Sequence, residues 1–264
     1  MRRLRLLATF GRRLDSLFEL QVPSLRDGGR LALLRSRVRP LAGAAQALLD
    51  AELLPALAAR GAALTRWDAL GETARDALDR LFLTEISPLL TPLTVDAGHP
   101  FPCVASLALN LAVLVREPDG EGLRYVGIEV PPTLARFVAA PPGPALLRVE
   151  DVIGAHLGVL LPGLEVVCHH AFRVTRDGRP RRALSGAGPS RRTRAAVRLE
   201  LEAATPAPLR ALLCSALGLW EDDVYPVAGS LDLCGIASLP VARVLRAAPG
   251  GLGPMRAARS SERV

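Results

Sequence analysis

The stretch LLTPLTVDAGHPFP, residues 89–102, divides the chain into a part with helical spacing and a part with strand spacing. Its prolines, Pro92, Pro100 and Pro102, fix φ and favour an extended backbone at the residues before them, so a regular helix is not expected to continue through it. We therefore expect a stiff joint here, at which the fold changes from helices to a sheet.

The same stretch contains Asp96 and His99, a carboxylate and an imidazole three residues apart that could support acid–base chemistry. A catalytic histidine works with a nucleophile or a metal, and no such partner is visible around it in the sequence. The mechanical interpretation accounts for the prolines without a site, and we favour it over the catalytic one.

Residues 1–87 are expected to form a helical N-terminal domain. A second helix is predicted over about 31–60 with Gly61 as its stop, and a third from Thr65 or Asp68 to about residue 86. Short connections between three helices favour a small antiparallel bundle. The first helix is predicted from apolar residues that recur at spacings of three, four and seven: Leu4, Leu7, Leu14, Leu17 and Phe18.

Residues 88–245 are expected to form a mixed α/β middle domain, followed by a disordered tail or truncated linker at 246–264. The fold class is therefore α+β, a helical bundle followed by a mixed sheet. Residues 131–138 are predicted as a short turn or helix. The other predicted elements are strands at 107–115, 123–130, 164–176 and 195–204, and helices at 149–161 and 206–218.

The strand predicted around residues 196–202, AVRLELE, alternates cleanly. Successive side chains of a strand point to opposite faces. One face is expected to carry Val197, Leu199 and Leu201, and the other Arg198, Glu200 and Glu202.

All 33 basic residues are arginine, and the chain has no lysine. A lysine Schiff base, a phosphate-loop lysine and a lysine general base are therefore excluded. The sequence also contains no GxGxxG, GxxxxGK[ST], GxSxG or HExxH motif, so the residues alone indicate no complete active site.

The positive charge is local. The formal net charge is +7, and residues 171–200 hold nine arginines against Asp177 and Glu200, which accounts for all of it. Arginine forks match phosphate oxygens, although such a segment can also be a solvated loop. No aromatic residue interleaves with these arginines, which argues against stacking on nucleic-acid bases. The candidate polyanion-binding residues are Arg179, Arg181, Arg182, Arg191, Arg192 and Arg194.

The four cysteines, Cys103, Cys168, Cys214 and Cys234, are far apart and form no CxxC pair, which is typical of a reduced, cytoplasmic chain. Cys168 and His170 would share one face of a strand, but two ligands do not make a zinc site, so no metal is expected. No apolar run reaches the 18 or so residues of a membrane helix, and no membrane span is expected.

Several motifs occur in the order found in the N-terminal half of bacterial polyphosphate kinase, of the kind whose catalytic half is similar to phospholipase D. They extend over about residues 2–245, and the segments LTPLTVDAGHPFP and FRVTRD are the most specific. The full set is LRLLATFGRRLDSLFELQV, ISPLLTPLTVDAGHPFP, LARFV, VEDVIGAHL, AFRVTRD, AVRLELE and DVYPVAGSLDL. The chain resembles that family.

The resemblance implies a helical domain that helps to form a nucleotide pocket and a middle domain that contributes to dimer contacts. In the family, the phosphorylated histidine, the magnesium-binding arginines and most ATP contacts lie in the C-terminal half, which this sequence stops before. The family uses ATP and magnesium, but no cofactor is expected for this chain by itself. The counterpart of LTPLTVDAGHPFP leads into the middle domain, which favours the mechanical interpretation of that stretch.

The chain also departs from the family. Arg12 and Arg13 replace two asparagines of a motif that is roughly SNNLDEF, and Arg13 stands at the family's nucleotide contact, while Leu14, Asp15 and Phe18 are retained. After RVTRD the family carries an acidic stretch, and here an arginine-rich one stands in its place.

Three hypotheses follow for function. The chain is a truncated relative without phosphotransfer activity that serves as a binding or assembly module, pairing with itself, with a full-length polyphosphate kinase or with polyphosphate. Alternatively, it is one half of a split enzyme whose catalytic half is separate. In the third, it is a basic module that associates with RNA or the ribosome.

Overall fold

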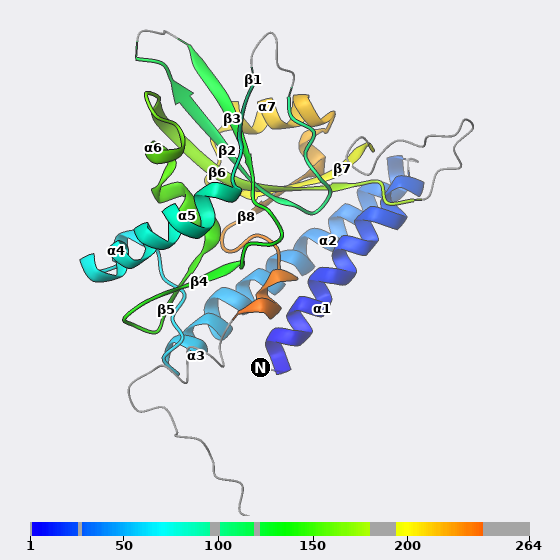
Figure 1. The fold of residues 1–264 in the computed structure, drawn as a ribbon. Helices are drawn as coiled ribbons and strands as arrows, with labels where there is room; N and C mark the ends of the chain where they lie inside the picture. Colours follow the sequence, from blue (N-terminus) through cyan, green and yellow to red (C-terminus); the bar gives the residue numbers. More distant parts are fainter. Residues whose placement is uncertain (1, 26–27, 96–100, 119–121, 180–193, 240–264) are drawn as a thin grey trace, which may run out of the picture.

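The computed structural model describes residues 2–25, 28–95, 101–118, 122–179 and 194–239. Two long helices lie side by side along one flank of a twisted sheet, and shorter helices cover the sheet itself (Figure 1). Helices come first and a mixed sheet follows, so the predicted α+β fold is confirmed.

The long helices match their predictions. Helix α1, Arg2–Ser16, continues into a π-helical turn, Leu17–Gln21. Helix α2, Gly28–Leu48, a π-helical turn, Leu49–Leu53, and α3, Leu54–Ala58, form one continuous helix. Gly61 follows it with φ of +84°, a left-handed conformation that favours glycine and ends the helix as expected.

This continuous helix, Gly28–Ala58, is long and apolar enough to cross a membrane, judged by length and composition alone. That differs from the expectation that no segment would reach this threshold. Helices of proteins that never enter a membrane pass the same test. Leu49, Leu53 and Leu57 are buried in a cluster with residues of α1 and of the middle domain. The absence of a membrane span stays a prediction.

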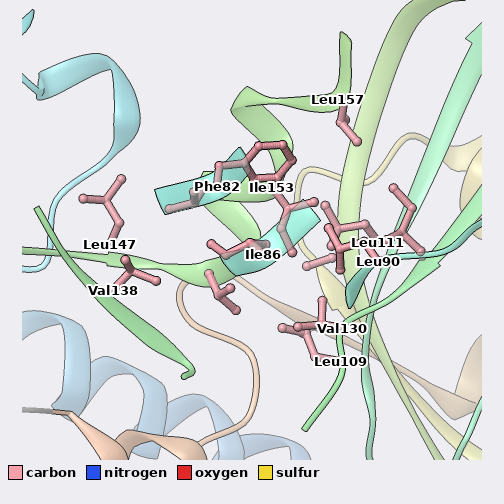
Figure 2. Close-up of a cluster of buried hydrophobic side chains, with 14 of the residues drawn as sticks. Phe82, Ile86, Leu90, Leu109, Leu111, Val130, Val138, Leu147, Ile153 and Leu157 are labelled. Carbon is pink, nitrogen blue, oxygen red and sulfur yellow. The ribbon is translucent and has the colours of Figure 1, made fainter. Parts of the chain in front are cut away.

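The third helix packs differently from the expected bundle. Helix α4, Glu72–Leu81, and the turn after it, Phe82–Ile86, place Leu78 and Phe82 in the apolar core that covers the sheet, and Figure 2 shows Phe82 within it. Helix α1 and the long helix share a separate apolar cluster. The chain after Gly61 explains this position. Thr65 N–H donates to Leu146 O at 2.8 Å, which directs the chain towards the middle domain before α4 begins.

The main sheet has six strands in the order β1-β3-β2-β6-β7-β8, and all neighbours are antiparallel except β7 and β8. A hairpin of β4 and β5 stands apart from it. The bounds are β1 Pro92–Val95, β2 Leu109–Arg116, β3 Leu123–Glu129, β4 Phe137–Ala140, β5 Ala145–Arg148, β6 Glu165–Arg176, β7 Ala196–Glu202 and β8 Val224–Val227.

Strand β2 shows how the sheet is covered on both faces. Leu111 and Val113 belong to the cluster that contains α4, while Ala112 and Leu114 belong to the cluster that contains helix α7, Ala207–Leu217. Because successive residues of a strand point to opposite faces, the helices lie on both sides of the sheet. Helices α5, Val149–Ala155, and α6, Leu157–Leu160, lie within the predicted 149–161 helix.

Four strands were not predicted: β1, which lies in the stretch that was expected to be a joint, β4 and β5 of the separate hairpin, and β8. Residues 131–138 were expected to form a turn or helix, but β4 begins at Phe137 and pairs with β5. Strand β8 was not predicted at all, and its sequence, VYPV, carries a proline. Four residues are too few to show the alternation of apolar and polar side chains that predicts a strand, and proline is tolerated in an edge strand.

Candidate functional site

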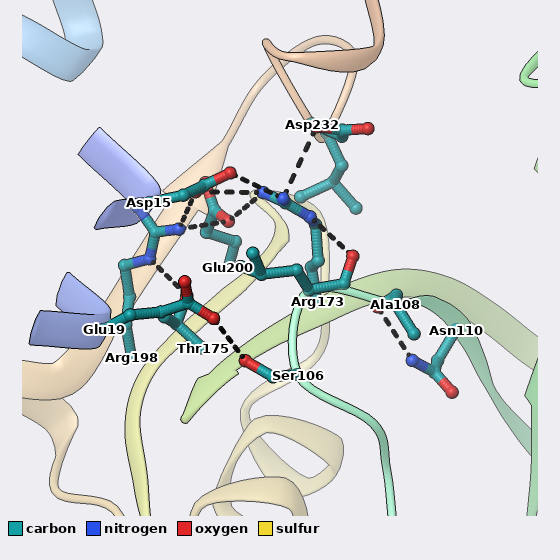
Figure 3. Close-up of polar contacts among 12 residues, drawn as sticks. Asp15, Glu19, Ser106, Ala108, Asn110, Arg173, Thr175, Arg198, Glu200 and Asp232 are labelled. Carbon is teal, nitrogen blue, oxygen red and sulfur yellow. Dashed lines mark hydrogen bonds and ion pairs between the residues drawn. The ribbon is translucent and has the colours of Figure 1, made fainter. Parts of the chain in front are cut away.

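A cluster of charged side chains lies where α1 meets the sheet (Figure 3). Asp15 of α1 accepts a hydrogen bond from Nη2 of Arg173 on β6 at 2.7 Å, and another from Nη2 of Arg198 on β7. All three residues are buried. We call this group, together with Glu200 and Asp232, the buried ion cluster.

Glu200 and Asp232 complete the cluster. Glu200 Oε2 lies 2.9 Å from Arg173 Nη1 and 3.0 Å from Arg198 Nη2, and Asp232 Oδ1 lies 3.5 Å from Arg173 Nη2. Arg198 Nε donates to Thr175 Oγ1 at 3.0 Å. The fork of each guanidinium therefore meets several acceptors, which is the geometry in which arginine ion pairs are strongest.

Asp15 and Arg173 are held in their charged forms. Burial alone would raise the pKa of Asp15, but the charges and hydrogen bonds of Arg173 and Arg198 outweigh it and hold that pKa below its usual value. Burial alone would lower the pKa of Arg173, but Glu200, Asp232 and Asp15 raise it above its usual value. Groups held so firmly in their charged forms suit a structural joint and not proton transfer.

The cluster changes the interpretation of β7. Arg198 was predicted on the polar face of this strand, and it does lie opposite Leu199 and Leu201, yet its exposed fraction is only 1%. Val197 was predicted on the face of these two leucines, but it packs against the cluster that contains Phe18. Its guanidinium lies 4.5 Å above the ring of Phe18. The polar face of β7 is thus covered by the N-terminal helices and joins the two parts of the chain.

The arginine-rich segment is less uniform than its composition indicates. Arg176 is buried, with Nε donating to Val104 O at 2.8 Å and Nη1 to Arg194 O at 2.6 Å. Arg173, Arg176 and Arg198 therefore belong to the fold, which corrects the view of nine arginines as one surface patch. We call these three the core arginines.

The candidate polyanion-binding residues are described only in part. Arg179 pairs with Asp177 at 2.9 Å, and Arg194 Nη1 donates to Asp177 O at 3.3 Å. Together with Arg176, Arg194 lines a cavity of about 530 Å³. Arg181, Arg182, Arg191 and Arg192 lie outside the described residues. Their contact with a polyanion stays a prediction.

Residues Arg12 and Arg13 are exposed on α1, while Asp15 one turn along points into the buried ion cluster. The retained Phe18 is buried as well, with its ring centroid 5.2 Å from that of Tyr225. The retained positions of the motif thus hold the fold together. The role of Arg13 at a nucleotide contact stays a prediction.

The structure describes only some of the other candidate residues. Asp96 and His99 lie outside the described residues. Cys168 and His170 lie on β6, where His170 Nδ1 is 3.3 Å from Glu202 Oε2. Within the described ranges, no three histidine, cysteine or acidic side chains are grouped so that they could hold a metal ion.

The sequence interpretation missed the buried ion cluster. Its signal was present in the retained Asp15 and in the alternation of β7, where Arg198 and Glu200 stand on one face. Charged residues on one face of a strand normally indicate that this face is exposed to solvent. Only the position of α1 over that face shows that these charges are partners of Asp15.

Comparisons with known proteins agree with this architecture. The family model described as "Polyphosphate kinase middle domain" matches residues 73–239. The chain is 41% identical over 216 residues to the polyphosphate kinase of Streptomyces coelicolor, covering 78% of this chain and 29% of that protein. It is 35% identical over 281 residues to the polyphosphate kinase of Synechocystis sp., covering 91% and 39%.

A crystal structure of polyphosphate kinase from Porphyromonas gingivalis superposes on the chain with a TM-score of 0.77 at 23% identity, covering 90% of this chain and 36% of that one. This likeness supports the fold. The chain spans roughly a third of the length of these relatives. The resemblance found in the motifs is thereby confirmed.

Proposed function

Because the chain belongs to the polyphosphate kinase family, we propose that it is a binding and assembly module of that family, and that by itself it transfers no phosphoryl group. The observation that carries this proposal is the division of its arginines. The core arginines are buried and engaged within the fold, whereas the six candidate polyanion-binding arginines, from Arg179 to Arg194, have no carboxylate among them in the sequence.

The arrangement of cations supports the absence of phosphoryl transfer. That reaction needs positioned cations around the phosphate and a nucleophile or activated water. Arg173 and Arg198 are engaged by Asp15 and Glu200, and the chain has no lysine. Arg148 is likewise held by Asp151 at 2.7 Å.

Radiolabelled ATP tests this part of the proposal. We expect the isolated chain to give neither long-chain polyphosphate nor a phosphohistidine on the protein. Either product above the background of a heat-denatured sample would contradict the proposal.

Polyphosphate binding follows from the charge of the segment between Arg179 and Arg194. Each arginine that meets a phosphate releases counterions, so the affinity should fall steeply between about 50 and 200 mM salt. Ordering the backbone and the long arginine side chains of such a segment on binding costs conformational entropy, which keeps the affinity weak.

Filter binding of polyphosphate and of RNA, each across a salt series, tests this binding. The test variant replaces Arg179, Arg181, Arg182, Arg191, Arg192 and Arg194 by serine. The control has the same charge change at six exposed arginines elsewhere: Arg2, Arg5, Arg30, Arg37, Arg60 and Arg66. We expect the test variant to lose most polyphosphate binding and the control to keep it. Equal losses would mean that only net charge matters, and tighter binding of RNA would favour an RNA-associated module.

The proposal that the chain assembles with a partner protein rests on the exposed apolar residues of the N-terminal helices. Leu6 of α1 is 61% exposed, and Leu33 and Leu41 of α2 are each 57% exposed. Since the relatives are about three times as long, the partners that we propose are a full-length polyphosphate kinase, a separate catalytic half or a second copy of this chain. Light scattering coupled to size exclusion, on the chain alone and mixed with a polyphosphate kinase, would detect each of them. A monomer in both samples would contradict assembly.

We place this module in the cytoplasm. Among the described residues no disulfide joins Cys103, Cys168, Cys214 or Cys234, as a reducing compartment would require. Fractionation of cells that express the tagged chain would test this location, and recovery with the membrane pellet would contradict it.

A further inference from the structure

A cavity of about 370 Å³ lies between α2 and the segment that begins with β8. Arg39, Gly43, Gln46, Ala47 and Asp50 form its α2 wall, and their spacings of three, four and seven place them along one stripe of the helix. Glycine and alanine at the centre of the stripe leave the space open, because larger side chains there would fill it.

The wall of this cavity carries more negative than positive charge. In the buried ion cluster, two guanidinium groups face three carboxylates, and two of those carboxylates, Glu200 and Asp232, line the cavity. Asp50 adds another. Both its oxygens accept from Gln46 Nε2, at 3.1 and 3.0 Å. The positive charge nearby is that of Arg148, which is outside the cavity wall and is already bound to Asp151 at 2.7 Å.

The arginines that line the cavity do not remove this excess, and Arg136, which acts on Asp232 from outside the wall, is already bound to Glu150. Arg39 lies at the opposite end of the stripe from Asp50, with its guanidinium 4.8 Å above the Tyr225 ring and Nη2 donating to Asp222 O. Arg198 is already bound by Asp15 and Glu200. A surplus of buried negative charge is costly unless a cation compensates it.

Two polar atoms at the cavity also lack hydrogen-bond partners within the described part of the chain. They are the hydroxyl oxygen of Tyr225, a residue that is only 7% exposed, and Oδ1 of Asp232, which has an ion-pair distance of 3.5 Å to Arg173 but accepts no hydrogen bond. Buried polar groups are nearly always hydrogen-bonded in native proteins. An ammonium group could donate to both kinds of oxygen, since it carries three donors.

Gly229 brings the opposite wall close to Asp50. A Cβ at this position would collide with Gln46 Nε2 and with both carboxylate oxygens of Asp50. The loop after β8 can therefore approach the Gln46–Asp50 pair only with glycine here, and this approach encloses the acidic end of the cavity.

We propose that this cavity binds a small organic cation, an aliphatic ammonium whose charged group faces Asp50 and Asp232 and whose apolar body lies along the α2 stripe against Val227 and Leu233. The described residues offer no group of three ligands for a metal ion, and the apolar lining suits a hydrocarbon body. This site is separate from the arginine segment and does not depend on phosphate chemistry.

Titration calorimetry with pentylammonium tests the proposal, and 1-pentanol, nearly the same shape without the charge, is the matched ligand. At constant ionic strength we expect saturable binding of pentylammonium with one site per chain, at least 10-fold tighter than that of pentanol. Equal affinities for the two ligands, or no saturable binding of pentylammonium up to tens of millimolar, would overturn the proposal.

Variants locate the binding to this cavity. Gly43→Leu should fill it, since a Cβ at Gly43 meets no atom within 4 Å, and binding should be lost. Ala44→Leu is the control, because Ala44 is exposed on the same helix but does not line the cavity. Asp50→Asn keeps the shape and should weaken binding about 10-fold, equivalent to about 1.4 kcal/mol. Unchanged binding in Gly43→Leu, with the melting temperature preserved, would place the ligand elsewhere and overturn the proposal.

Discussion

Arg173, Arg176 and Arg198 stand within a few residues of Arg179 and Arg194, yet their environments are opposite. The core arginines are at least 91% buried and bind carboxylates, a hydroxyl or backbone carbonyls of distant segments. Arg179 is 37% exposed at its side chain and pairs with a neighbour two residues away. All of these residues count equally in the composition, and only their positions in the fold separate them: β6 and β7 direct Arg173 and Arg198 towards Asp15 of α1, and Arg176 towards the carbonyl oxygens of Val104 and Arg194.

Removing one core arginine tests this difference most directly and should have the largest effect on stability. Arg198→Met keeps much of the side chain's volume but leaves Asp15 and Glu200 with one fewer partner, and a buried charge without its partner typically costs about 3–5 kcal/mol of stability. Urea unfolding would measure the loss. The control is Arg116→Met, since Arg116 on β2 pairs with Glu165 at the surface, where such a pair contributes about 0–1 kcal/mol. A loss no larger than that of the control would contradict the structural role of the cluster.

Lowering the pH should also weaken the buried ion cluster, with a smaller loss of stability than the removal of Arg198. The pKa of Asp15 is lower in the folded chain than in the unfolded one, so its contribution to stability is present above about pH 4 and is lost as the pH falls through the folded value. Asp15→Asn lacks this titration. The difference in unfolding free energy between the two proteins should therefore shrink between pH 6 and pH 3 in urea titrations. A difference that is independent of pH would contradict it.

The arginines outside the core should have less influence on stability. Replacing all six from Arg179 to Arg194 by serine should leave the melting temperature within about 2 °C of the unaltered chain, because the contacts of Arg179 and Arg194 with Asp177 lie partly in solvent and such contacts contribute little to folding. Differential scanning calorimetry would measure this, on the same variant that is used for polyphosphate binding. A cooperative unfolding transition displaced by 10 °C or more would show that the segment is part of the fold.

The smallest effect is expected from replacing Arg12 and Arg13, and it concerns the affinity for ATP. Both are exposed on α1, and two bulky cations replace amides that donate and accept hydrogen bonds. We expect the unaltered chain to bind ATP weakly if at all, and the double change Arg12→Asn, Arg13→Asn to alter this little. Calorimetry that gave a micromolar dissociation constant for the unaltered chain would contradict this.

Much of the fold could be predicted because most elements have a clear period. The long helix ending at Gly61 and the strands β2, β3 and β6 match their predictions closely. The position of α4 could not be predicted, since an amphipathic helix shows that it has an apolar face but not which surface will cover it. The buried ion cluster could not be predicted either, because its members come from α1, β6, β7 and a loop, and charged residues are mostly exposed.

The separation of Asp15 from its partners along the chain has a consequence for synthesis. Arg173 is 158 residues and Arg198 183 residues away from it. At about 5–20 residues per second, the ribosome needs on the order of 10–40 s to deliver Arg198 after Asp15. Throughout that interval α1 has emerged without the strands that neutralise Asp15 and cover Phe18. The N-terminal helices are therefore synthesised long before the strands on which they dock, and chaperones that bind nascent chains would meet them with their apolar face uncovered.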